Sequence, residues 1–298
     1  MVRAIRKVLA VGAITGIFLA IGIAVAFRNS DPALPNPNAY DDFVKAGQMA
    51  CEPLDGEGRF ADYRELTFQD LKLCATTNEA ALQLTRKALE RQSRIPIQND
   101  AEWFGNHLPE LATFKTLTTV FLLHARLALL EGRTNDAVNL YLDSIRFAHE
   151  CNRGGLIVHT SIARTQEALG LEGLKTIASD LDANQCRRIT TVLEEIDEKE
   201  ESWGYYSRRN MRYTAQAETK SLFSLDDWRT NQRFKTRFFQ SQLRRRQTIL
   251  TYAARAYQLE TGSIATNALT LVPAHIKKVP TDPISGRQLF LSGNQLPR

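Results

Sequence analysis

Histidines are the residues of this chain best suited to proton transfer or metal binding, and the sequence holds five. His149 and His159 lie on either side of the Gly154-Gly155 turn, so a hairpin there could bring both rings to one metal ion. The zinc motif H-E-x-x-H, which His149 would begin, needs a histidine at position 153, where the sequence has arginine. We therefore predict two surface imidazoles here and no metal site.

Carboxylates offer a second kind of chemistry. Glu194 and Glu198 share one face of a predicted helix, but seven of the eight residues from 194 to 201 are charged. Such a run is usually solvated rather than buried enough to make a general acid. Trp203 and Tyr205 could stack on a sugar ring, which would suit a glycan-acting enzyme. A nucleophile elbow, a glycine-rich phosphate loop and a C-x2-C pair are absent from the sequence, which predicts no catalytic residue and no cofactor.

Arginines dominate the last predicted helix, which spans residues 226–259 and has eight basic side chains against two acidic ones. Such a face could bind an anionic envelope polymer, lipid head groups or an acidic protein. Alternatively, it is a solvated face that pairs with the acidic run at 194–201. The candidate anionic-partner face consists of Arg229, Arg233, Arg237, Arg244 and Arg245.

Four cysteines leave two possibilities open. An even number suits an oxidising compartment, and pairing neighbours in sequence would join helices that are close in the chain. Buried free thiols are the alternative, because cysteine is often buried as a small apolar residue. The possible disulfides are Cys51 with Cys74 and Cys151 with Cys186.

The start of the chain predicts a membrane anchor. An uncharged run of 20 residues begins at Val8 and ends at Phe27, enough to span a bilayer as a helix, and basic residues 3, 6 and 7 precede it. The positive-inside rule then places the N-terminus in the cytosol and exports the rest. A signal peptide cleaved after Ala26 is the alternative, which would make the domain secreted or periplasmic. The net charge of +5 and this topology make nucleic acid an unlikely partner.

Hydrophobic periodicity predicts an all-α domain after this anchor. From Leu111 onward, apolar residues form two stripes at helical spacing, so this helix must be buried on two sides, with His124 in the core. Gly132 then provides a helix stop, and Thr134 can cap a second helix with small residues and Tyr141 on one face. The sequence therefore predicts a helical hairpin.

This hairpin resembles half of a tetratricopeptide repeat through Gly132, Ala137, Tyr141 and Ser144. A weaker echo around Ala81 lies outside the spacing of about 34 residues that such repeats keep. The resemblance implies irregular, stacked antiparallel hairpins. We expect a cytosolic segment at 1–7, an anchor at 8–27, a Pro-rich linker at 28–39, an exported helical domain at 40–260 and a packed tail at 261–298.

The tail resembles that of uncharacterised bacterial membrane-anchored helical proteins, and more distantly that of the pseudopilins of type II secretion. Ala265 and Ala268 depart from the pattern, which has proline and leucine there. The resemblance brings no known activity. Matching residues are Tyr257, Gly262, Leu271, Val272, Pro273, Val279, Pro280, Asp282, Pro283, Gly286 and Leu289.

Together these patterns predict a membrane-anchored, non-catalytic interaction or scaffold module of the cell envelope, because stacked hairpins offer a binding surface that needs no catalytic group. Its expected partner is a protein or an anionic envelope polymer. Two alternatives are an envelope enzyme acting on glycan, which requires an acid of raised pKa beside Trp203 and Tyr205, and an accessory component of a secretion or pilus-like system.

Overall fold

The computed structural model describes residues 32–98, 100–216 and 228–291, apart from the side chains of Ala101, Trp228 and Arg229. The chain divides into two compact units, Met1–Leu34 and Pro35–Arg298, and the described helices belong to the second unit. The anchor predicted at residues 8–27 lies outside the described residues.

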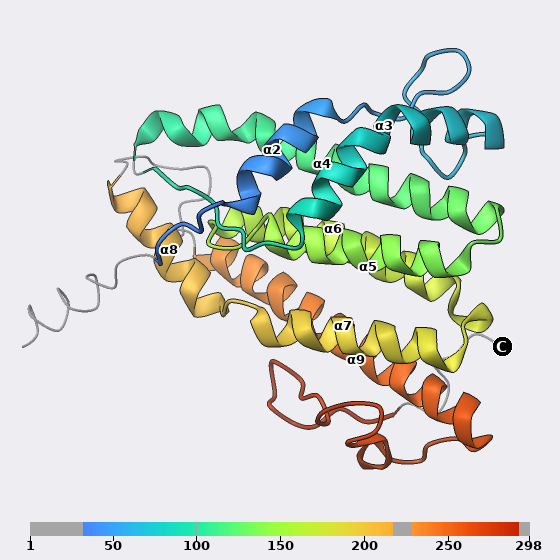
Figure 1. The fold of residues 1–298 in the computed structure, drawn as a ribbon. Coiled ribbons are helices and arrows are strands. Elements are labelled where there is room, and N and C mark those ends of the chain that lie inside the picture. The colour runs from blue at the N-terminus through green and yellow to red at the C-terminus, as the bar shows by residue number, and fades with distance from the viewer. Residues whose placement is uncertain (1–31, 99, 217–227, 292–298) are drawn as a thin grey trace, which may run out of the picture. The chain divides into compact units, whose positions relative to one another are not determined.

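The regular elements of the described residues are helices, which confirms the predicted all-α class (Figure 1). Two short 3₁₀ helices, η1 (Ala178–Asp180) and η2 (Ala268–Leu271), accompany them. The α-helices are α2 (Ala39–Met49), α3 (Phe68–Ala88), α4 (Ala101–Leu130), α5 (Thr134–Glu150), α6 (Ile157–Thr176), α7 (Ala183–Lys199), α8 (Trp203–Gln216) and α9 (Trp228–Thr261).

Neighbouring helices pack on one another in chain order from α2 to α6 (Figure 1). Short turns reverse the chain between α4 and α5 and between α5 and α6, so these three helices form successive antiparallel hairpins. Helix α7 packs on α5 and α9, and α9 also packs on α6. The long helix α9 therefore reaches two elements that precede it by many residues.

Helix α4 forms the centre of the core. Both predicted stripes are buried except at Leu130, the last helical residue, which is exposed. Phe114, Phe121 and Leu123 are nearly inaccessible to solvent. The helix begins at Ala101, ten residues before the predicted start, because it continues through Pro109. From Glu102 to Leu130 it is long and apolar enough to cross a membrane, but 67% of its most apolar window is buried inside the protein. Its apolar residues thus serve the core.

The predicted turn at Gly132 joins α4 to α5. Gly132 has a φ of 73°, a conformation that glycine adopts without strain, and the Arg133 amide closes the helix end by donating to the Ala128 carbonyl. Thr134 does not cap α5 as predicted, because it is already the first helical residue, and Arg133 takes the cap position without a side-chain bond.

Helices α5 and α6 approach closely where Tyr141 faces two glycines. A Cβ atom placed on Gly173 would lie 2.2 Å from the Tyr141 ring, and one on Gly170 would lie 2.6 Å from the Ile145 side chain. The tyrosine therefore occupies space that any larger residue at 173 would fill. Sequence periodicity predicted Tyr141 as the aromatic of this face and left its glycine partners unassigned.

After α9 the chain folds back on the helices. Leu271 and Ile276 are buried in the same core as α4 and α5. The Lys277 amide donates to the Glu194 carboxylate (2.9 Å), and Arg187 of α7 donates to the Ala274 carbonyl (3.1 Å). These bonds hold the described part of the tail against α7.

Candidate functional site

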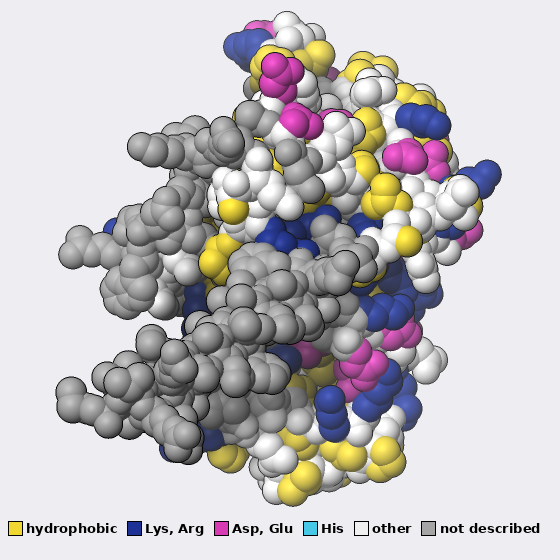
Figure 2. All heavy atoms as spheres, turned by 90° about the vertical axis from the view of Figure 1, so that its left-hand side faces the viewer, with side chains coloured by type: hydrophobic (Ala, Val, Ile, Leu, Met, Phe, Trp, Pro, Cys, Tyr) yellow, Lys and Arg dark blue, Asp and Glu magenta, His cyan; other side chains and the backbone are white. Residues whose placement is uncertain are grey.

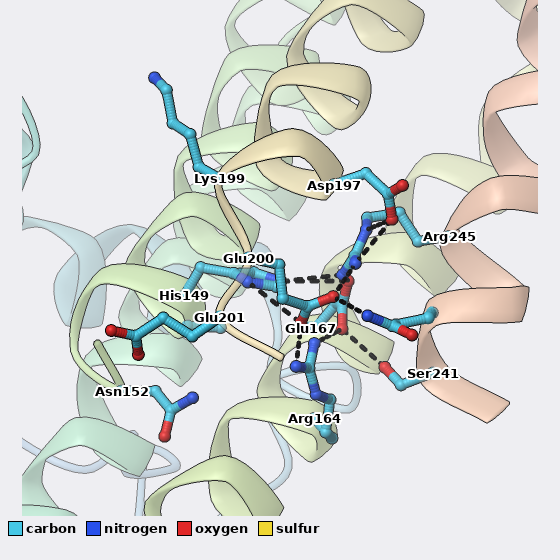
Figure 3. Close-up of polar contacts among 12 residues, drawn as sticks. His149, Asn152, Arg164, Glu167, Asp197, Lys199, Glu200, Glu201, Ser241 and Arg245 are labelled. Atoms are coloured by element: carbon cyan, nitrogen blue, oxygen red, sulfur yellow. Dashed lines mark hydrogen bonds and ion pairs between the residues drawn. The ribbon is translucent and has the colours of Figure 1, made fainter. Parts of the chain in front are cut away.

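A cluster of charged residues lies buried where α5, α6, α7 and α9 meet (Figure 3). Arg245 of α9 is inaccessible to solvent and donates to Glu167 of α6 and to Glu200, just after α7. It also donates to Asp197 (2.9 Å), which in turn accepts from Arg246 (2.9 Å). We call the set Arg164, Glu167, Asp197, Glu200, Arg245 and Arg246 the charge cluster.

Opposite charges balance inside this cluster, which contains three arginines and three carboxylates. Burial by itself would raise the pKa of Glu200, but Arg245 and Arg164 outweigh it and lower this pKa to about 2. The pKa of Glu167 is likewise lowered well below its usual range, against the effect of burial, by Arg245, His149 and Arg164. Both groups are therefore ionised at neutral pH, and neither is suited to act as a general acid.

Arg245 was predicted to lie on the exposed anionic-partner face, and this assignment is wrong. Arg244 is exposed, Arg245 is fully buried, and Arg246 is half-buried. Three successive arginines differ because each residue turns the side chain by about 100° around the helix. The Arg229 side chain lies outside the described residues.

Three other arginines of the predicted face do lie on the surface of α9. Arg233, Arg237 and Arg244 are exposed, and none has a hydrogen bond or an ion pair from its side chain to a described residue. Steps of four and seven residues keep them on one side of the helix. We call these three side chains the arginine row.

The acidic run at 194–201, the alternative partner of these arginines, is bound elsewhere. Asp197 and Glu200 belong to the charge cluster, and Glu198 binds Lys277 at 2.9 Å. Glu201 accepts from Arg94 (3.3 Å) and from the Gly154 amide (2.8 Å). The run therefore pairs with the inner side of α9 and with the loops and tail, and leaves the arginine row without a partner among the described residues.

A pocket of about 290 Å³ opens beside the arginine row, between α6, α8 and α9. Its lining combines aromatic rings, namely Trp203, Phe234 and Phe238, with Arg164, Arg237 and Arg244, and holds no acidic residue among those described. The Arg164 guanidinium lies 4.6 Å from the centre of the Phe238 ring, and its Nε has no hydrogen-bond partner among the described residues. We call this cavity the α9 pocket.

A second pocket, of about 320 Å³, borders the charge cluster at Glu200 and is also lined by His149. Acidic side chains outnumber basic ones in its lining, so its charge is opposite to that of the α9 pocket. The acidic residues are Glu90, Glu150, Glu195, Glu200 and Glu201, and the basic ones are Arg146, Arg153 and Lys199.

His149 and His159, which the sequence placed together as surface residues, have different partners in the structure. The His149 Nε2 lies 3.2 Å from both Glu167 and Arg245 in the charge cluster. His159 is buried, and its Nε2 lies 2.8 Å from the Nε2 of His107. The described residues contain no group of three or more His, Cys, Asp or Glu side chains that could hold a metal ion.

Hydrogen bonds fix the tautomers of the buried histidine pair. The Leu156 amide donates to His159 Nδ1 (3.0 Å), so His159 carries its proton on Nε2 and donates it to His107. His107 then holds its own proton on Nδ1, which lies 2.9 Å from the Glu110 carboxylate. Burial above all, and also the charge of Arg209, keep the pKa of His159 well below its usual value. Both rings are therefore bonded as neutral imidazoles.

The possible disulfides are not present in the structure, where all four cysteines are free. Cys51 is exposed, and the other three are buried. The Cys151 thiol donates to the Ala148 carbonyl (3.5 Å), and burial raises the pKa of Cys186 to about 11. The alternative of buried thiols describes Cys74, Cys151 and Cys186.

The two aromatic residues considered for sugar stacking contact different parts of the protein. Trp203 lines the α9 pocket, and its ring centre lies 5.7 Å from that of Phe238. The Tyr205 hydroxyl instead accepts from Arg94 (2.8 Å) and from Arg209 (3.0 Å). Only the tryptophan of this pair therefore contributes to a cavity beside α9.

His124 lies in the core, as predicted for the two-striped helix. Burial lowers its pKa, and its Nε2 has no hydrogen-bond partner among the described residues. Its Nδ1 lies 3.8 Å from the Glu79 carboxylate of α3, so the ring joins two neighbouring helices.

Sequence reasoning missed Arg164 and Glu167, which form the α6 part of the charge cluster. They occupy the buried face of α6 between Ile157 and Leu171 at helical spacing, and they bind each other at 3.0 Å. Opposite charges three residues apart inside an apolar stripe were the signal for a buried pair.

Comparison of the chain with protein-family models, with curated proteins and with solved structures yields no match.

Proposed function

We propose that this protein is a membrane-anchored interaction module of the cell envelope that binds an acidic partner along α9. The observation that carries the proposal is the arginine row, whose three exposed guanidinium groups face solvent without an acidic neighbour among the described residues. Figure 2 shows one face of the molecule, on which basic and acidic side chains lie interspersed. The arginine row differs from such mixed surface because its charges have a single sign.

Binding suits this site better than glycan hydrolysis. An acid for hydrolysis would need a raised pKa next to Trp203, whereas Glu200 and Glu167, the buried carboxylates of the charge cluster, have lowered pKa values and arginine partners. Arginine binds carboxylates in a bidentate manner, and charged rows of this kind speed association and select partners by sign.

The binding test uses the full-length chain in detergent and a fluorescein-labelled oligoglutamate as the probe. Reversing the arginine row with R233E, R237E and R244E should weaken binding at least about tenfold, and added salt should weaken the unmodified protein's binding. The matched control carries K72E, K87E and K115E on α3 and α4, which gives the same net charge on exposed positions of helices that do not pack on α9. Equal loss in both variants would refute a site on α9.

The location is tested separately. Alkaline phosphatase, which is active only after export, is fused to the end of the chain and assayed in intact cells and in their membrane fraction. We expect membrane-bound activity, because the run from Val8 to Phe27 is long enough to span a bilayer and follows basic residues. Stable but inactive fusion protein would refute the envelope location.

A further inference from the structure

We infer that the α9 pocket receives the aromatic side chain of an acidic linear segment, so that the partner is a protein whose exposed segment places one tyrosine between glutamates or aspartates. This inference rests on the proposed function and adds a specificity pocket to it. The pocket and the arginine row share Arg237 and Arg244, which makes one continuous site.

The spacing of the arginine row fits an extended peptide. With a rise of about 1.5 Å per residue, Arg233 and Arg237 lie about 6 Å apart along α9, and Arg237 and Arg244 about 10 Å apart. An extended chain advances about 3.3 Å per residue and repeats each face every second residue. Acidic side chains two residues apart therefore match the first pair of arginines, and the longer second interval leaves room for a further side chain.

The α9 pocket opens mainly in that second interval, because five of its six α9 lining residues fall there and only Phe234 precedes Arg237. The five are Arg237, Phe238, Gln240, Ser241 and Arg244. Its volume of about 290 Å³ is at the lower end of the range for small-molecule sites, which suits one large side chain. Trp203 is only half-buried, so part of its ring remains open to contact. Aromatic side chains bind such surfaces with a large apolar area and few rotamers.

Polar groups in the pocket favour tyrosine over phenylalanine. The lining includes the hydroxyl groups of Thr160, Ser161 and Ser241, and Arg164 Nε is a buried donor with no partner among the described residues. The Thr160 and Ser241 hydroxyl groups already donate to the Leu156 carbonyl and to Glu167, so their oxygens remain as acceptors. A phenol can donate to such an oxygen and accept from Arg164 Nε, whereas a phenyl ring leaves that buried donor without a partner.

A row of charges also favours a peptide over a membrane surface. Lipid head groups form a plane and would be matched by basic side chains spread over several elements. In this site the arginines of the row all lie on one helix, α9, and two of them also line the pocket. The geometry therefore fits a linear ligand.

The experiment compares two short labelled peptides, glutamates with a central tyrosine and glutamates with a central alanine, on the full-length chain in detergent. The tyrosine peptide should bind at least about tenfold more tightly, since burial of an aromatic side chain is worth that much. T165W, at an exposed residue of the pocket rim, should remove this advantage, so that the two peptides bind with similar affinities.

The matched control is T76W on α3. Thr76 is exposed and its hydroxyl donates to the carbonyl four residues earlier, as that of Thr165 does, but it lies on a helix that does not pack on α9. T76W should retain the advantage of the tyrosine peptide.

Three results would overturn the inference. Equal affinities for the two peptides, both lost in the arginine reversal, would refute the pocket and leave the proposed function standing. Failure of both peptides to bind would refute the proposed function together with the pocket. Displacement of the tyrosine peptide by a soluble short-chain anionic phospholipid at lower concentration than by unlabelled peptide would identify a lipid as the ligand instead.

Discussion

The arginine row and the charge cluster use the same residue type in opposite ways on the same helix. Arg244 is exposed and has no ion pair with a described residue, whereas Arg245, the next residue, is enclosed by Glu167, Asp197 and Glu200. The inner arginines hold α9 to α6 and α7, and the outer ones contribute little to that packing. Position around the helix therefore separates arginines that stabilise the fold from arginines that remain open to a partner.

The largest effect on stability is expected from replacing the buried Arg245, compared with replacing its exposed neighbour Arg244. R245M should lower the free energy of unfolding by about 3–5 kcal/mol, because it leaves buried carboxylates without their main counter-charge. R244M should change it by no more than about 0.5 kcal/mol, as surface substitutions usually do. Urea unfolding of both full-length variants in the same detergent provides the measurement. Similar values for the two variants would mean that the charge cluster does not hold α9.

Two glycines allow a second comparison, because Gly173 is closely packed whereas Gly105 has open space beside it. G173A should destabilise the protein by about 1–3 kcal/mol, because the new methyl group would collide with the Tyr141 ring. G105A should instead stabilise it by about 0.5–1 kcal/mol, since Gly105 lies within α4 with no atom in the way and alanine favours the helix. The same unfolding assay should give opposite signs, and a G173A variant as stable as the unmodified protein would contradict the close α5 and α6 packing.

The histidine pair allows the smallest and most selective test, by pH. Because the pKa of His159 is lowered in the folded state, the unfolded chain takes up its proton first, and the stability due to His159 is lost as pH falls below about 6.5. The loss cannot exceed about 1.4 kcal/mol per pH unit for one proton. Glu200, whose pKa is lowered from 4.5 to about 2, loses its contribution only as pH falls below about 4.5.

Two steps should therefore separate in the acid dependence of unfolding. H159Q should reduce the step near pH 6.5, to which His124 with its lowered pKa also contributes, and retain the one below 4.5. If the wild-type stability stays constant between pH 7 and pH 5, the neutral pair is not what holds the start of α6.

Local sequence features predicted much of this architecture. Gly132 marked the hairpin, and the two stripes of α4 marked a helix buried on both sides, because periodicity and helix stops are local properties. The predicted start of α4 at Leu111 was wrong because Pro109 lies inside this helix, where proline is rarer than before a helix start.

The site was less accessible to sequence reasoning. The surface position of Arg237 followed from composition, but the burial of Arg245 depends on Glu167, which lies on another helix and 78 residues earlier. Charges are interpreted as solvated unless a partner is known, and no local pattern identifies a partner that far away. The aromatic pocket combines α6, α8 and α9 and thus depends on tertiary packing.

The members of the charge cluster lie far apart in the sequence, so they are synthesised at different times. The carboxylates of α6 and α7 emerge before Arg245, so the nascent chain carries Glu167, Asp197 and Glu200 with Arg164 as the only arginine of the cluster yet present. We expect these carboxylates to stay hydrated until α9 packs against them. Helix α9 should then be the last helix to gain protection in pulsed hydrogen exchange during refolding. Protection of α9 before α6 would contradict this order. Assembly of the fold and completion of the binding face would then be the same event.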